Sequence, residues 1–152
     1  LDQSEIPTSG SASMSGKAVF NVAYRHNQAN SDYGVTQYSS NATVNGTFNW
    51  GSGSYSGQLD FTNFDSGNSL VSNAGFTSFS VSLAGSGATY AGSLNDTNNG
   101  WTREAVIAGA LYGNNTPVES GGRISVGLSK SGSLGTSGAN DFYMAEGIYL
   151  ID

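Results

Sequence analysis

The chain contains no cysteine, which excludes disulfide bonds, zinc–thiolate sites and thiol nucleophiles together. Charged residues are scarce as well, at 11% of the 152 residues, less than half the usual share in globular proteins. Five Lys and Arg stand against eleven Asp and Glu, giving a net charge of −6. The Lys and Arg residues are not clustered in the sequence, so no nucleic-acid-binding groove is expected. Without a run of eighteen apolar residues, no membrane-spanning helix is expected either.

Catalytic and metal-binding signatures are also missing. The chain has no Gly-x-Ser-x-Gly elbow, no His-Glu-x-x-His and no phosphate-binding loop, and its only histidine is His26. The carboxylates Asp60, Asp65 and Asp96 stand in or beside turns, where Asp is favoured because its side chain bonds the local backbone. No EF-hand spacing accompanies them. We therefore expect neither an enzyme nor a metal site.

The chain is rich in glycine and aromatic residues, and it contains stretches in which apolar and polar residues alternate. Twenty-two Gly against two Pro predict many tight turns, and eight Tyr, seven Phe and two Trp supply bulk for a core. The clearest alternation covers residues 42–50, where apolar or small residues share one face and Thr and Asn share the other. One apolar and one polar face are typical of an antiparallel sheet with one side in water.

About eight strands of this kind follow one another, with no long helical periodicity between them. They begin near residues 17, 42, 55, 77, 88, 105, 124 and 141. This count predicts an all-β fold, an eight-stranded antiparallel up-and-down β-barrel, because closure removes exposed strand edges. A two-sheet sandwich is the alternative, because alternation alone does not distinguish closure from two layers. We expect residues 1–15 to be a flexible, disordered N-terminal tether and residues 16–152 a single, monomeric barrel domain.

The segment 105–126, AVIAGALYGNNTPVESGGRISV, is predicted to form a hairpin with a large structured tip. Ala105, Ile107, Gly109 and Leu111 fall on one face of its first strand, and Ile124 opens the apolar face of the second. The polar excursion between them, which includes Pro117 and Glu119, has room for one helical turn.

Part of this segment, LYGNNTPVESGGRISV, resembles a motif in the C-terminal barrels of transferrin-binding protein B and its relatives. These Gram-negative surface lipoproteins include the factor H-binding protein, the Neisseria heparin-binding antigen and small secreted haem-binding proteins. Tyr112-Gly113, the acidic Glu119 and the pair Gly121-Gly122 match the family pattern, whereas Leu111 replaces the usual aromatic residue.

The resemblance implies a non-enzymatic binding protein on the outer-membrane surface of a Gram-negative bacterium, or secreted from it. Its partner would be a host protein or an iron or haem source, bound by loops at the barrel rim. A lipid anchor would lie outside the present chain. Two alternatives remain open: a carrier of haem or another small ligand inside or at the mouth of the barrel, and a structural module of a larger adhesin.

Candidate binding residues come from the two long loops. The loop over residues 27–41 carries Tyr33 and Tyr38, and the loop over residues 62–74 carries Phe64 and Leu70. Exposed aromatic residues on long loops are the ones most suited to anchor a partner. The apolar residues of the second loop either fold back on the rim or form a contact patch. His26, at a strand end beside the first loop, is a candidate axial haem ligand, with a partly exposed histidine of no ligand role as the alternative.

Overall fold

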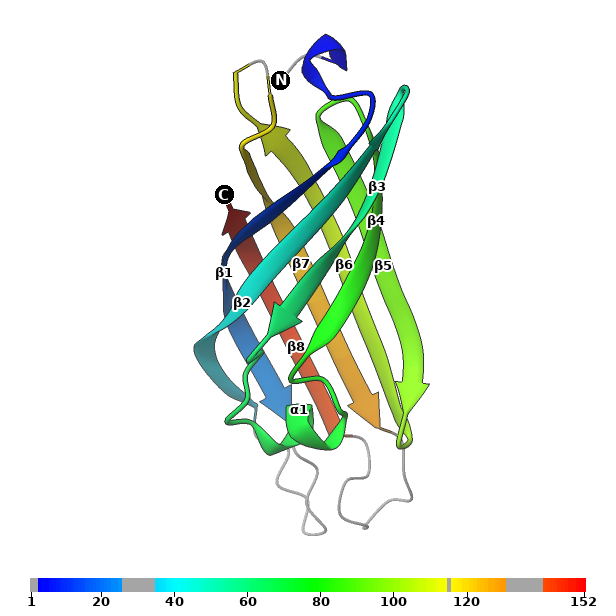
Figure 1. The fold of residues 1–152 in the computed structure, drawn as a ribbon. Coiled ribbons are helices and arrows are strands. Elements are labelled where there is room, and N and C mark those ends of the chain that lie inside the picture. Colours follow the sequence, from blue (N-terminus) through cyan, green and yellow to red (C-terminus); the bar gives the residue numbers. More distant parts are fainter. Residues whose placement is uncertain (1–2, 26–34, 115, 131–140) are drawn as a thin grey trace, which may run out of the picture.

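Eight antiparallel strands close into one barrel in chain order (Figure 1). The computed structural model describes residues 3–25, 35–114, 116–130 and 141–152. Closure is direct, because the first strand pairs with both the second and the last. The up-and-down barrel is thus confirmed, and the two-layer sandwich is wrong. The elements are η1 (Gln3–Glu5), β1 (Ser11–Arg25), β2 (Thr36–Gly51), β3 (Ser54–Thr62), α1 (Ser69–Asn73), β4 (Phe79–Ser86), β5 (Thr89–Asn98), β6 (Trp101–Tyr112), β7 (Glu119–Lys130) and β8 (Asp141–Ile151).

The first strand begins earlier than its sequence pattern suggested. Residues 11–15 belong to β1 and pair with β2, from Ser11 opposite Asn49 to Ser15 opposite Asn45. The prediction of a flexible tether is therefore wrong for residues 11–15. Met14 is buried on the inner face of this part of the strand. Serines at alternate positions hid the strand, because they resemble a linker in composition while occupying the outer face of the barrel.

The hairpin over residues 105–126 forms as expected, with a longer second strand. β6 and β7 pair continuously from Trp101 opposite Lys130 to Tyr112 opposite Glu119, so β7 begins at Glu119 and includes the glycine pair. The described residues of the tip, 113–114 and 116–118, form no helical turn. The inner faces are the predicted ones, since Ile107, Leu111 and Ile124 are all buried.

Aromatic side chains fill the barrel from end to end. The largest side chains that are completely buried include Trp101, Tyr143, Phe20, Phe48, Phe61, Phe64 and Phe76. Glycines on the inner face make room for tyrosine tips: a Cβ added to Gly109 would lie 2.5 Å from the Tyr90 hydroxyl oxygen, and one added to Gly122 would lie 2.6 Å from that of Tyr149. In an eight-stranded barrel, such side chains occupy the space in which a small ligand would otherwise lie.

The two ends of the barrel differ. In Figure 1 the helix α1 lies across the lower end, and the β2–β3 turn and η1 lie at the upper end. We call the end that carries α1 the lower rim. The segment 63–78, which connects β3 to β4 and contains α1, is the plug. Of all the connections that the structure describes, the plug is the longest. The lower rim is therefore the first place to look for a functional site.

Candidate functional site

The plug folds into the barrel and closes its lower end. Its apolar side chains are buried: Phe64, Leu70, Val71, Ala74 and Phe76. The Phe76 ring stacks on the Phe79 ring, with 4.1 Å between the ring centroids. The Phe64 and Phe20 rings meet edge to face, with 4.9 Å between their centroids. Asn68 caps α1 by accepting a hydrogen bond from the backbone N–H of Leu70 at 2.9 Å. The plug is thus an ordered part of the core.

Arg103 ties the plug to the wall. Its Nε and Nη2 donate to the two carboxylate oxygens of Asp96, each at 2.7 Å. Its Nη1 donates to the carbonyls of Ala74 and Gly75 at 3.2 and 3.1 Å, and its guanidinium lies 5.6 Å from the centre of the Phe76 ring. The hydrogen bond from Arg103 lowers the pKa of Asp96, and the same bond raises the pKa of Arg103. One cation therefore satisfies both a wall carboxylate and the carbonyls at the end of the plug.

Asp65, in the plug, is the centre of a second network. Its Oδ2 accepts hydrogen bonds from the hydroxyls of Tyr38 and Tyr143, the latter at 2.9 Å, and its Oδ1 accepts from Ser40 Oγ at 3.3 Å. The backbone of Asp65 is left-handed, with φ of 39°, a conformation that Asp tolerates better than most residues.

The tyrosines of this network remain hydroxyl donors over a wide pH range. Burial and the bond to Asp65 raise the pKa of Tyr38, and burial followed by the charge of Asp65 raises the pKa of Tyr143. Both effects favour the neutral phenol over the phenolate. Asn68 Nδ2 also donates to the Tyr38 oxygen at 2.8 Å, which connects the cap of α1 to the same network.

A hollow of about 500 Å³ opens beside this network at the lower rim. Its lining comes from the end of β1, the start of β2 and the plug: Tyr24, Tyr38, Asp65, Gly67, Asn68, Ser69 and Leu70. The rings of Tyr24 and Tyr38 meet nearly at right angles, with 6.0 Å between their centroids. Tyrosine rings, an amide, a hydroxyl and one carboxylate make the hollow suitable for a ligand that combines apolar surface with hydrogen-bond donors.

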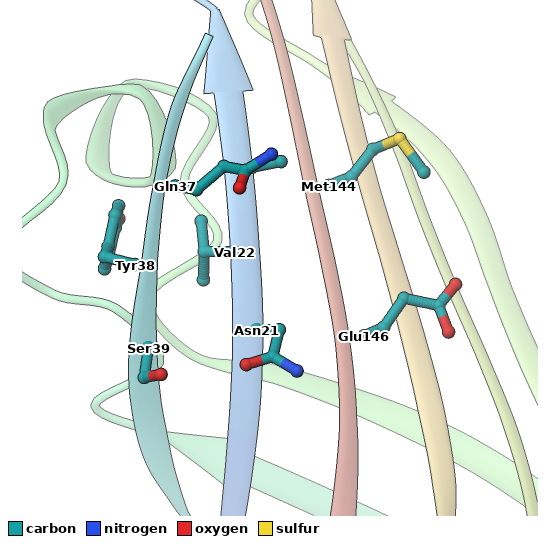
Figure 2. Close-up of a pocket in the computed structure, with 8 residues that line it drawn as sticks. Asn21, Val22, Gln37, Tyr38, Ser39, Met144 and Glu146 are labelled. Atoms are coloured by element: carbon teal, nitrogen blue, oxygen red, sulfur yellow. The ribbon is translucent and has the colours of Figure 1, made fainter.

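A second hollow, of about 560 Å³, lies on the outer wall over β8, β1 and β2 (Figure 2). Figure 2 shows Met144 and Glu146 from β8, Asn21 from β1, and Gln37 and Ser39 from β2 around it. Glu146 also accepts a hydrogen bond from Ser125 at 3.2 Å. The side chains here are mostly solvated outer-face residues, so the lower rim has the more organised polar chemistry.

The predicted binding residues fall into three groups. Tyr38 lies in strand β2 and not in a loop, and its partly buried ring lines the rim hollow. Phe64 and Leu70 are 0% and 2% exposed, so their side chains form no exposed contact patch. They fold back into the core, where they complete its apolar packing. Tyr33 and His26 lie outside the described residues.

Sequence reasoning missed the residues that organise the rim. Asp65 looked like an ordinary turn carboxylate, and its partners Tyr38 and Tyr143 are 27 and 78 residues away along the chain. Arg103 stands in no sequence motif, yet in the structure it binds Asp96 and the plug. The one local signal was the turn sequence Asp-Ser-Gly-Asn at residues 65–68.

Over the described ranges, no three acidic or histidine side chains come close enough to hold a metal ion. No helix in the same part of the chain is long and apolar enough to cross a membrane. No family model matches the chain, and no curated protein matches it.

Proposed function

We propose that this chain is a non-enzymatic binding protein, exposed on the surface of a Gram-negative bacterium or secreted from it, that captures a host factor through its lower rim. The observation that carries the proposal is the contrast between the packed barrel axis and the open hollow at the rim. A filled axis leaves the rim as the place where a ligand has access to organised polar groups.

Three further observations support this proposal. The plug is held by Arg103 and by the Asp65 network, so the rim presents a preformed surface whose ordering cost is met before binding. Serine, asparagine and tyrosine, which dominate the lining, give adaptable hydrogen bonding and amphipathic contact. The likeness of LYGNNTPVESGGRISV to the transferrin-binding protein B family supports the surface location and the host partner.

The test is capture from serum with a blocked rim. Ser69 is exposed on the rim, and Ser69→Trp places a large ring at the mouth of the hollow. We expect the unmodified protein to retain a serum component that mass spectrometry identifies, and we expect Ser69→Trp to lose it.

The matched control is Ser52→Trp, which adds the same ring to an exposed turn at the opposite end of the barrel. This variant should capture the same component as the unmodified protein. Retention by Ser69→Trp, or loss in Ser52→Trp alone, would move the binding surface away from the lower rim.

A further inference from the structure

The rim hollow contains a carboxylate whose described hydrogen bonds come only from hydroxyl groups. Asp65 is 8% exposed and accepts from Tyr38, Tyr143 and Ser40. By contrast, Asp96 is held by the guanidinium of Arg103. A buried carboxylate is stabilised best by an opposite charge, and hydroxyl donors leave its net charge in place. The hollow therefore has a negative centre.

Among the described residues, no other charged side chain lines the hollow. Its remaining members are tyrosine, glycine, asparagine, serine and leucine, and the whole chain has a net charge of −6. This environment repels phosphate, sulfate and carboxylate ligands and attracts cations.

Tyr24 and Tyr38 add the second element of a cation site. Both rings line the hollow, and their perpendicular arrangement turns the two ring planes in different directions beside the carboxylate. The face of an aromatic ring attracts an ammonium group, and attraction to a carboxylate acts in the same direction. Leu70 provides apolar surface for the carbon chain that carries such a group.

The site is also preorganised. Asn68 caps α1 and donates to the Tyr38 hydroxyl, so the position of the ring is coupled to the position of the plug. Because Asp65 already accepts from two tyrosines, its carboxylate cannot rotate freely toward solvent. A ligand that enters would meet groups already in place, which lowers the cost of binding.

We propose that the lower-rim hollow binds an alkylammonium group, with Asp65 as its counter-ion and the rings of Tyr24 and Tyr38 as its walls. The inference rests on the proposed function and specifies the chemistry of the ligand. The group can come from a lysine side chain of a protein partner or from a free amine, and the test separates these two sources.

Three small probes decide the question: Nα-acetyl-lysine methylamide, its uncharged analogue Nα-acetyl-norleucine methylamide, and free butylamine. Binding is followed by NMR chemical-shift changes of the backbone amides of the rim, at low ionic strength. We expect the lysine derivative to shift amides of the plug in a saturable manner and the norleucine derivative to leave them unchanged. Equal binding of both derivatives, or binding of neither, would overturn the proposal.

Two variants locate the effect. Asp65→Asn removes the charge while keeping the shape and the tolerance for left-handed backbone, and it should lower affinity for the lysine derivative by about tenfold or more. Asp60→Asn makes the same charge change on the outer face of β3, away from the hollow, and should leave affinity unchanged. Equal losses in both variants would attribute binding to general electrostatics and overturn the site.

If Asp65→Asn fails to fold, Ser69→Lys replaces it. An ammonium tethered at the exposed mouth should compete with the probe, whereas the uncharged Ser69→Gln should not. Equal affinity in these two variants and the unmodified protein would contradict the proposal.

The remaining outcomes separate the sources and the two proposals. Binding of butylamine as tight as that of the lysine derivative assigns the site to free amines; tighter binding of the lysine derivative assigns it to a protein side chain. Probe binding without serum capture retains the alkylammonium site and removes the host-capture function. Serum capture that needs the rim, without probe binding, retains the function and overturns this inference.

Discussion

Gly109 and Gly122 face each other across β6 and β7 and leave the space that the Tyr90 and Tyr149 hydroxyls occupy. These two hydroxyls bond each other at 2.8 Å, and Tyr90 also bonds Ser120 at 2.6 Å. The inner face thus combines glycines with long tyrosine side chains. The tyrosines need the space that the glycines leave, and without the tyrosines that space would be a cavity. This pairing explains why glycine is frequent at inward strand positions of the barrel.

Gly109→Ala should therefore destabilise the barrel. Its Cβ would lie 2.5 Å from the Tyr90 oxygen, which forces the tyrosine pair to move, and we expect a loss of roughly 1–3 kcal/mol in the free energy of unfolding. Urea denaturation measures it. Gly127→Ala is the matched control, because the nearest atom to its Cβ is 4.0 Å away, and it should be close to neutral. Equal effects at the two positions would contradict the packing argument.

The Asp65 network provides a second test at the residue scale. Tyr143→Phe removes one hydroxyl that donates to a buried carboxylate, and we expect a loss of about 1–3 kcal/mol in stability. Tyr112→Phe removes a hydroxyl from a ring that is half exposed, so it should change the stability little. Thermal denaturation of the two variants gives the comparison, and a neutral Tyr143→Phe would show that the hydroxyl does not support Asp65.

At the scale of elements, the plug closes the lower end of the barrel and forms much of the lower rim. It belongs to no strand, yet its apolar residues are among the most completely buried in the molecule. Phe76 and Ala74 bond back to Val71 and Leu70 within the plug, at 3.0 and 2.9 Å, so its own backbone is largely satisfied. Side chains of the wall hold its carbonyls as well: Arg103 donates to those of Ala74 and Gly75, and Asn98 Nδ2 donates to that of Ala74 at 3.2 Å.

Arg103→Met should loosen the plug without opening the barrel. The variant keeps an apolar chain near Phe76 but removes the bonds to the Ala74 and Gly75 carbonyls and the ion pair with Asp96. We expect a loss of about 1–3 kcal/mol, concentrated in the plug.

Hydrogen exchange at the Ala74 and Phe76 amides measures this effect, and exchange should accelerate there while the amides of β6 and β7 change little. Arg123→Met, at an exposed position of β7, is the control and should leave the plug amides protected. Uniform acceleration over the whole barrel would mean that the plug does not open on its own.

The strand β8 shows how element faces can be misjudged. Ile148 and Leu150 share an apolar face in the sequence, but this face is the outer one, and the two side chains are 66% and 60% exposed. Tyr143, Ala145, Tyr149 and Ile151 fill the inner face instead. Both faces of β8 are apolar at this end, so alternation could not decide between them; the bond from Tyr149 to Tyr90 shows which side the core takes.

At the scale of the whole molecule, several buried tyrosines give stability a common pH dependence. Burial raises the pKa of Tyr55 to about 12, and burial also raises the pKa values of Tyr90 and Tyr149. An unfolded tyrosine ionises near pH 10. The folded state therefore keeps its protons where the unfolded state loses them, so the associated stability is complete below about pH 10 and is lost as pH rises through the folded pKa values.

We accordingly expect the free energy of unfolding to be level between about pH 7 and 9 and to fall progressively above about pH 10. Urea titrations across this range measure it, with tyrosinate absorbance as a check on ionisation. Tyr55→Phe should make the fall less steep, because it removes one of the contributing groups. Stability that stays constant to about pH 12 would contradict this account.

Much of the fold was predictable because it depends on local patterns. Alternating residues such as those at 42–50 fix which strands form, and the number of short strands without helices favours closure. The candidate site was far less predictable. Tyr38 was chosen as an exposed loop residue but lies in β2, and Asp65 was assigned to an ordinary turn. Their roles depend on contacts between residues far apart in the chain, which no local pattern reports.

The amino-acid sequence alone thus determined the β-strand content, the antiparallel order and most inward-facing positions, because a strand's side chains alternate with a fixed period of two. The tertiary structure decided which face of β8 enters the core, that the plug closes the lower rim, and that Asp65 meets two distant tyrosines. Those outcomes depend on the competition of many side chains for one enclosed volume, and that competition exists only once the barrel has closed.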